Sequence, residues 1–207
     1  MFKRWLKPLT FVLSLAPFSW CLYEVFLLLQ GQPHSLGADP GKAIVHFNGE
    51  WALRFLILTL MITPVRRLFS FPLIIRIRRM LGLFTFFYAT LHVVSYAVFL
   101  LELQFTDIVA DVIKRPYITV GFAAFSLLIP LAVTSNRWMI SRLRQRWKTV
   151  HQLVYLIAVL AIVHLAWLTK DDYRDVFFYG LAIAILLGVR AYRSGWLAQN
   201  SLIPLRR

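Results

Sequence analysis

Long apolar stretches separated by short polar segments set the pattern of this chain. Six such stretches run at about residues 9–29, 51–65, 80–101, 117–134, 150–168 and 176–189. A helix rises about 1.5 Å per residue, so about 20 apolar residues cross the roughly 30 Å hydrocarbon core of a bilayer. Four stretches reach or approach that length, and the second and sixth are shorter. The pattern predicts an all-α protein, a bundle of six transmembrane helices forming one membrane domain over residues 1–207.

The two short stretches leave an alternative open, because each is also compatible with a re-entrant or surface helix. In the second stretch Arg54 lies in the first turn, and its long side chain is expected to reach outward to the interface. Asp39 followed by Pro40 is typical of a helix start, with an N-cap and a proline at the first helical position. We expect a short surface helix from Asp39 to about Phe47, separate from the second span. Pro116 is expected to start the fourth span.

Composition narrows the class of protein. The chain has 207 residues, of which 59% are hydrophobic, and a formal net charge of +14. Its basic residues lie between apolar runs, which does not fit a soluble nucleic-acid binder, so no nucleic-acid partner is expected. Cys21 is the only cysteine, which excludes an intramolecular disulfide and any cysteine-based metal or iron–sulfur site. The first stretch has a basic start but no small-residue cleavage site, so it is expected to be an uncleaved anchor.

The charged residues predict how the chain is oriented. Four segments are basic and hold no acidic residue: Lys3, Arg4 and Lys7; Arg66, Arg67, Arg76, Arg78 and Arg79; Arg137, Arg142, Arg144, Arg146 and Lys148; and Arg190, Arg193, Arg206 and Arg207. The segments between them carry the acidic residues Asp39, Glu50, Glu102, Asp107, Asp111, Asp171, Asp172 and Asp175. Cytoplasmic loops are enriched in lysine and arginine. The alternation places both termini in the cytoplasm, and an even number of spans follows. Contact with anionic lipid is a secondary use of the same charges.

Two histidines, His92 and His164, lie inside predicted spans, where an ionisable residue is a functional candidate by default. The third and fifth spans both run from the inside to the outside. His92 lies thirteen residues beyond Arg79, and His164 lies thirteen residues beyond His151. Both therefore stand about 20 Å along their helices, at nearly the same depth. Two imidazoles facing each other there would supply both axial ligands of a haem iron between the third and fifth spans.

Two other interpretations of this histidine pair stay open. Each ring can simply pack between helices and hydrogen-bond a neighbour. A zinc ion would require three or four protein ligands, and Glu24 is the only acidic residue within a span. Two histidines without a third ligand fit haem better than zinc.

His151 lies at the inner rim of the fifth span. The matching end of the third span offers Arg78 and Arg79 and no histidine, so a second bis-histidine site is not supported. His151 can serve as a single ligand, hold a propionate, contact a flavin or an electron donor, or lie among lipid headgroups. The inner arginines can likewise bind propionates, a flavin phosphate or an acidic donor protein, or control topology alone.

A different class of function also competes. Intramembrane histidines occur in proton relays, so a small transporter or a proton or metal channel is the alternative. Transporters commonly contain repeated halves and broken helices. We find no internal repeat in the sequence, and only Pro17 and Pro130 interrupt the spans. A subunit that merely anchors a periplasmic enzyme is a third possibility.

A set of motifs in fixed order resembles a known family. The motifs are Leu36-Gly37-Ala38-Asp39-Pro40, His46-Phe47-Asn48-Gly49, Thr63-Pro64, Arg78-Arg79-Met80-Leu81-Gly82-Leu83, Thr90-Leu91-His92, Ser95-Tyr96, Arg115-Pro116-Tyr117, Thr134-Ser135, Trp147 to His151, Tyr155 and His164. Together they resemble the MsrQ (YedZ) family, haem-binding membrane subunits of bacterial periplasmic methionine-sulfoxide reductase systems, within the ferric reductase-like transmembrane group. The resemblance covers about residues 30–192, with a core at about 44–192. Asn48 and Val150 depart from the family pattern.

The resemblance implies a b-type cytochrome of the bacterial inner membrane that contains no catalytic residue of its own. It implies haem b with His92 and His164 as ligands of the iron, His151 as a further cofactor contact, and FMN as a second cofactor. Electrons would come from a cytoplasmic flavin reductase or from quinol. They would pass to a periplasmic, molybdopterin-containing, MsrP-like subunit that repairs oxidised envelope proteins.

Overall fold

The computed structural model describes residues 2–169 and 173–193, and this part of the chain is helical without a strand. Six helices are long: α1 (Phe2–Leu29), α2 (Pro40–Leu68), α3 (Ile75–Phe99), α5 (Pro116–Val133), α7 (Gln145–Leu168) and α8 (Arg174–Arg193). Three elements are short: η1 (Pro72–Ile74), α4 (Phe105–Lys114) and α6 (Arg137–Leu143). The predicted all-α class is confirmed.

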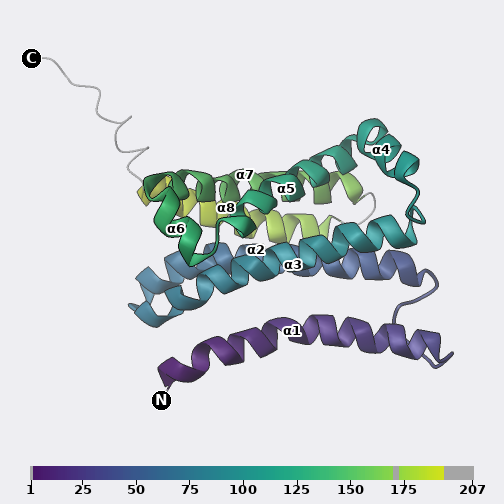
Figure 1. Ribbon diagram of the computed structural model, residues 1–207, viewed down its shortest axis with the longest axis horizontal. Helices are drawn as coiled ribbons and strands as arrows, with labels where there is room; N and C mark the ends of the chain where they lie inside the picture. The colour runs from purple at the N-terminus through teal and green to yellow at the C-terminus, as the bar shows by residue number, and fades with distance from the viewer. Residues whose placement is uncertain (1, 170–172, 194–207) are drawn as a thin grey trace, which may run out of the picture.

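The long helices lie side by side, and each runs opposite to the one before it (Figure 1). The start of α1 and the end of α8 therefore lie at the same end of the bundle, together with α6. The short helix α4 lies at the opposite end. The end that holds α6 is labelled the inner end of the bundle, and the end that holds α4 is labelled the outer end.

Five helical segments are long and apolar enough to cross a membrane, judged by length and composition over the described residues. They are Arg4–Leu29, Pro72–Phe99, Pro116–Val133, Gln145–Leu168 and Arg174–Tyr192. The remaining long helix, α2, has 29 residues but carries Glu50, Arg54, Arg66 and Arg67 within its length. Five predicted spans thus match candidate membrane helices, and a crossing by α2 stays a prediction.

The separate surface helix predicted for residues 39–47 is wrong. A single helix runs from Pro40 to Leu68, because the intervening Asn48 and Gly49 are packed inside the bundle rather than in a turn. The start of this helix was predicted correctly, since the Asp39 carboxylate accepts a hydrogen bond from the Lys42 amide at 3.0 Å.

Arg54 is partly exposed and its guanidinium is held by two partners, while its reach to the membrane interface stays a prediction. Its guanidinium forms a 2.6 Å ion pair with Glu50 and donates to the Tyr179 hydroxyl at 3.0 Å. A charged group is costly to expose to hydrocarbon, and this pairing joins α2 to α8 instead.

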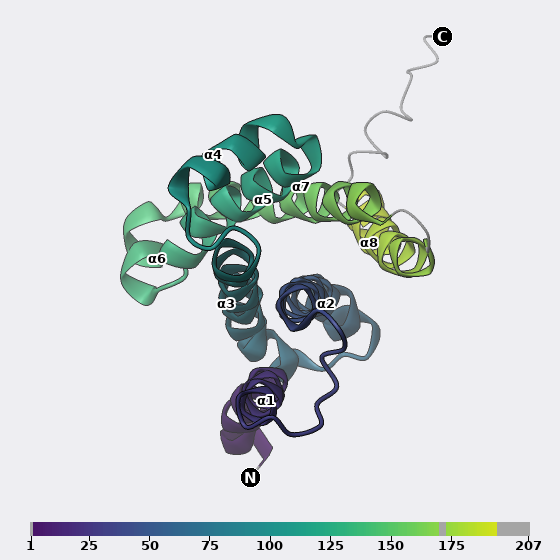
Figure 2. The same ribbon diagram turned by 90° about the vertical axis from the view of Figure 1, so that its right-hand side faces the viewer.

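Two antiparallel helix pairs form the core, α2 with α3 and α5 with α7. Viewed from one end, α2 and α3 form a middle layer, with α1 on one side and α5, α7 and α8 on the other (Figure 2). Leu60 of α2 and Ile157 and Ala158 of α7 are almost completely buried where the two pairs meet. A second cluster stacks Phe55 on the ring of Tyr88, with centroids 5.2 Å apart.

Tyr88 also fastens α1 to α3 at an interrupted point of α1. Its hydroxyl donates to the carbonyl of Ser14 at 2.8 Å and accepts from the amide of Phe18 at 3.1 Å. In an uninterrupted helix this amide and this carbonyl would bond to each other. Pro17 has no amide hydrogen to continue the ladder. The Tyr88 hydroxyl therefore replaces a missing backbone hydrogen bond of α1. On α3, Tyr88 lies one turn before His92.

At the outer end, α4 is tied to both of its neighbours. The Tyr96 hydroxyl of α3 donates to Asp111 of α4 at 2.5 Å, and Asp111 pairs with Arg115 at 3.2 Å. The Thr119 hydroxyl of α5 donates to the carbonyl of Val112 at 2.5 Å. Neither α4 nor α6 was predicted from the sequence.

Candidate functional site

His92 of α3 and His164 of α7 come together between the two helix pairs. Their ring centroids are 6.2 Å apart, and the ring planes cross at 79°. His92 is contributed by the α2–α3 pair and His164 by the α5–α7 pair, so neither pair contains the arrangement alone. The two helices thus bring the rings to one depth, where the sequence analysis expected them.

Each ring is held by a backbone carbonyl of the helix antiparallel to its own. The Nδ1 of His92 lies 2.8 Å from the carbonyl oxygen of Val45 on α2. The Nδ1 of His164 lies 2.7 Å from the carbonyl oxygen of Tyr117 on α5. A carbonyl oxygen can only accept, so in each ring Nδ1 carries the hydrogen and donates it. The Nε2 lone pair of each ring is left available to a metal, which is how ligating histidines are usually oriented.

The two histidines are held in equivalent ways. Both pairings join residues 47 positions apart, and in both a glycine follows the carbonyl residue by one helical turn, Gly49 after Val45 and Gly121 after Tyr117. No internal repeat is evident in the sequence, yet the α2–α3 and α5–α7 pairs hold their histidines with one geometry.

The spacing of the rings fits a shared iron. Metal–imidazole bonds are about 2 Å long, and an imidazole nitrogen lies about 1 Å from its ring centroid, so one metal bound between two rings separates their centroids by about 6 Å. The observed 6.2 Å agrees with this value. Two neutral imidazoles are a donor set that haem proteins use. Over the described residues, no three His, Cys, Asp or Glu side chains gather to hold a metal ion, whereas a zinc site uses three or four protein ligands.

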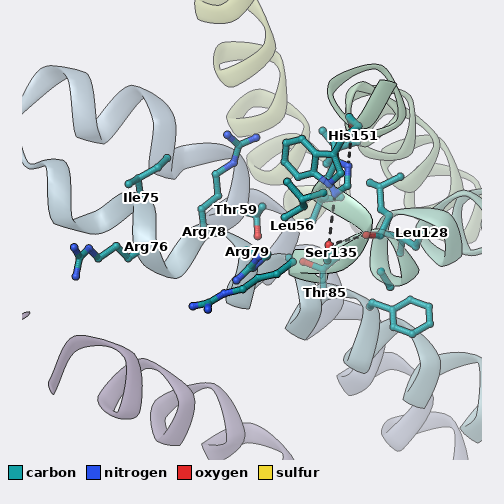
Figure 3. A pocket seen from close by; sticks show the side chains of 18 of the residues that line it. Leu56, Thr59, Ile75, Arg76, Arg78, Arg79, Thr85, Leu128, Ser135 and His151 are labelled. Carbon is teal, nitrogen blue, oxygen red and sulfur yellow. Dashed lines mark hydrogen bonds between the residues drawn. The ribbon is translucent and has the colours of Figure 1, made fainter. Parts of the chain in front are cut away.

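His151 belongs to a different place, a cavity of about 610 Å³ toward the inner end. Its ring stacks on Trp147 with centroids 4.0 Å apart, and its Nδ1 lies 3.1 Å from the Trp147 carbonyl. Its Nε2 lies 3.5 Å from the Ser135 hydroxyl. Figure 3 shows this contact as a dashed line, with Arg78 and Arg79 of α3 lying across the cavity from it.

The cavity is strongly basic. Its lining includes the cations Lys7, Arg76, Arg78, Arg79 and Arg137, and no acidic residue is among the lining residues. Apolar side chains form much of the remaining wall, with Leu56, Phe86, Leu128, Leu131 and Val154 among them, and Thr59, Thr85 and Ser135 add hydroxyl groups. Such a wall suits a flat or apolar molecule with anionic substituents. His151 stands thirteen residues before His164, about 20 Å along α7, so it does not join the histidine pair.

Comparison with known proteins adds independent evidence. Residues 48–162 match the family model described as the ferric reductase like transmembrane component. A protein of Xanthomonas oryzae pv. oryzae named protein-methionine-sulfoxide reductase heme-binding subunit MsrQ is 46% identical over 187 residues, which cover 90% of this chain and 86% of that protein. A protein of the same name from Polaromonas naphthalenivorans is 42% identical over 198 residues, 92% of this chain and 88% of that protein. The chain belongs to the MsrQ family of ferric reductase-like membrane proteins. The resemblance found in the sequence motifs is confirmed.

The family match runs through both helix pairs of this MsrQ-family chain. It begins in α2 and ends in α7, so it includes His92 and His151 and stops just before His164. Gly49 and Gly121 also lie inside the matched region.

The remaining candidate residues lie apart from the pair. His46 is exposed on α2 rather than in a loop, and the Nδ1 of His34 accepts from the Leu36 amide at 3.3 Å. Glu24 is buried and accepts from the Ser35 amide at 2.6 Å. Tyr88 and Tyr96, one turn on either side of His92, bond to α1 and α4.

Sequence reasoning missed the two carbonyls and the two glycines of this MsrQ-family site. A carbonyl has no side-chain identity to find in a sequence. The glycines had a usable indication, because an isolated glycine inside an apolar helix often marks a close approach.

Proposed function

We propose that this chain is a b-type cytochrome subunit that carries electrons across a membrane for a methionine-sulfoxide reductase. One observation carries the proposal: the rings of His92 and His164 are separated by 6.2 Å, and each donates Nδ1–H to a carbonyl. In the proposal, Nε2 of both histidines binds the iron of haem b. A haem bound there supplies a one-electron redox centre.

The chain's own residues have defined tasks in this proposal. His92 and His164 bind the iron, and the carbonyls of Val45 and Tyr117 fix the tautomer and the plane of each ring. Ala89 and Ala161, which precede the two histidines by three residues, pack against the apolar core of the bundle.

We propose six spans, with α2 included, and both termini in the cytoplasm of a bacterium whose inner membrane holds the protein. Three observations support this orientation: α1 starts and α8 ends at the same end of the bundle, the basic helix α6 lies at that end, and the acidic residues of α4 lie at the other. The whole chain, residues 1–207, would then be one membrane domain with its ferric reductase-like core at about 44–192.

We propose that electrons enter at the inner end, from a cytoplasmic flavin reductase or from quinol, and leave at the outer end. The acceptor would be a periplasmic, molybdopterin-containing, MsrP-like reductase subunit that repairs oxidised methionines. The names of the relatives support the reductase system, and the basic cavity beside His151 supports a site for an anionic cofactor or donor at the inner end. FMN is one such cofactor, and its phosphate would face Arg78 and Arg79.

The deciding experiment is a reduced-minus-oxidised spectrum of the purified protein, with haem and flavin quantified per chain. We expect a Soret band that shifts on reduction, and loss of most haem in His92→Ala and in His164→Ala. His46→Ala, which changes an exposed histidine, is the matched control and should keep its haem. A folded, colourless protein from haem-replete cells would disprove the proposal.

A transporter or channel is the second candidate. The repeated α2–α3 and α5–α7 geometry favours it, because transporters are often built from repeats. Ion flux through proteoliposomes made with haem-free protein would support this function, whereas no flux combined with reversible haem reduction would support the cytochrome.

A further inference from the structure

Each histidine of the pair has to pass a helix backbone to reach its carbonyl. In an α-helix the carbonyl of residue i accepts from the amide of residue i+4, and every Cβ tilts toward the helix N-terminus. The side chain of residue i+4 therefore overhangs the carbonyl of residue i. A ring that hydrogen-bonds Val45 must pass residue 49, and a ring that bonds Tyr117 must pass residue 121. Both positions are glycine.

The distances leave no room for a larger residue at either position. A Cβ added to Gly49 would lie 2.9 Å from Nδ1 and 3.0 Å from Cε1 of His92. A Cβ added to Gly121 would lie 2.8 Å from both Nδ1 and Cε1 of His164. Real Cβ contacts this short are essentially absent from proteins, so each ring would have to move. Because Nδ1 is among the ring atoms nearest to the added Cβ, this displacement would pull the Nδ1–H donor away from its carbonyl.

Other helical glycines of the chain differ in what they contact. An added Cβ at Gly180 would meet Ile162 at an ordinary 3.7 Å, and at Gly188 it would meet nothing within 4 Å. At Gly41 it would lie 2.9 Å from the Cβ of Phe99, a clash as severe as that at Gly49 but without a histidine. These three positions provide controls for helix propensity and for steric strain.

We propose that Gly49 and Gly121 are positioning residues for the proposed haem ligands. Each lets one imidazole approach the adjacent helix until Nδ1–H reaches a carbonyl, which sets the ring plane and directs Nε2 to the metal. Glycine is a poor residue for a helix interior, so its presence on both helices opposes helix formation and serves the approach of the rings. The inference rests on the proposed haem-binding function of the pair.

The test compares Gly49→Ala and Gly121→Ala with Gly180→Ala and Gly188→Ala in the purified full-length protein. Haem affinity should fall by about 10- to 100-fold in the first two, the usual effect of losing the partner that orients a metal ligand. Protein that retains haem should show an altered low-spin electron paramagnetic resonance signal and a shifted midpoint potential. The two control variants should match wild type in all three measurements.

Gly41→Ala separates ring displacement from general strain. It should lower the thermal stability of the fold while leaving the resonance signal and the potential of bound haem unchanged. If Gly41→Ala changes the haem spectrum as much as Gly49→Ala does, the effect is general strain and the inference is wrong.

If the glycine variants fold poorly, a double-mutant cycle still tests the proposal, because it measures whether their destabilisation depends on the histidine ring. In the His92→Ala background there is no ring to displace, so Gly49→Ala should no longer reduce yield or thermal stability there. The same holds for Gly121→Ala in the His164→Ala background. Destabilisation that persists in these backgrounds would overturn the positioning role.

The outcomes also separate this inference from the proposed function. If the wild type binds no haem, or if His92→Ala and His164→Ala keep it, the proposed function itself fails. If the histidine variants lose haem while Gly49→Ala and Gly121→Ala keep wild-type affinity, signal and potential, only the positioning role fails.

Discussion

The imidazole planes of His92 and His164 cross at 79°, which is close to perpendicular. Each plane is fixed by its own hydrogen bond to a different helix, so the crossing angle is a property of the fold. If both rings bound one iron while keeping this angle, two iron d orbitals would be nearly equal in energy. The ferric protein should therefore give a low-spin resonance with large g anisotropy. A well-resolved rhombic spectrum, typical of parallel imidazole planes, would contradict this prediction.

His151 should be dispensable for the haem held by the pair. It lies about 20 Å from His164 along α7 and stacks on Trp147 at the inner cavity. We expect His151→Ala to leave the resonance signal of the His92/His164 site unchanged, and to weaken whatever cofactor or donor uses the cavity. Cofactor quantification and the rate of reduction by the donor measure the second effect. Loss of the His92/His164 signal in this variant would show that the two sites depend on each other.

Removing the Tyr88 hydroxyl should destabilise the junction of α1 with α3. The hydroxyl is the partner of both the Ser14 carbonyl and the Phe18 amide, and Tyr88 is completely buried. Leaving a buried polar group unsatisfied costs about 1–3 kcal/mol. Tyr88→Phe should lower the free energy of unfolding by about this amount, measured by thermal unfolding in nanodiscs. Tyr23→Phe, at an exposed position of α1, should have little effect. Unchanged stability in Tyr88→Phe would mean that α1 closes its own hydrogen bond.

Asp111 should control how firmly α4 is held at the outer end. Its carboxylate accepts from the Tyr96 hydroxyl and pairs with Arg115. Hydrogen bonds to charged groups contribute about 1.5–3 kcal/mol, so Asp111→Asn should make the amides of α4 exchange about tenfold faster or more. Hydrogen–deuterium exchange measures this effect. Asp107→Asn changes an exposed carboxylate of the same helix and should accelerate exchange much less. Equal exchange rates in the two variants would rule out the tether.

Local patterns determined much of the fold. The hydrophobic runs predicted the long helices, Pro116 predicted the start of α5, and Asp39 with Pro40 predicted the start of α2. The length of α2 could not be predicted, because whether Asn48 and Gly49 continue a helix depends on what packs against them. The short helix α4 was missed although its apolar residues recur at helical spacing, at Phe105, Ile108, Val109, Val112 and Ile113. The seven residues of α6 are too few to show such a pattern.

The sequence by itself determined that His92 and His164 stand at one depth, because helical rise converts residue spacing into height. Only the tertiary structure decided that the rings face each other, and that the carbonyls of Val45 and Tyr117 hold them. Depth is a property of a single helix, whereas rotation about the helix axis and the choice of a backbone partner depend on how neighbouring helices pack. Gly49 and Gly121 can be read from the sequence, but their role becomes evident only in the tertiary structure, where a histidine ring lies against each of them.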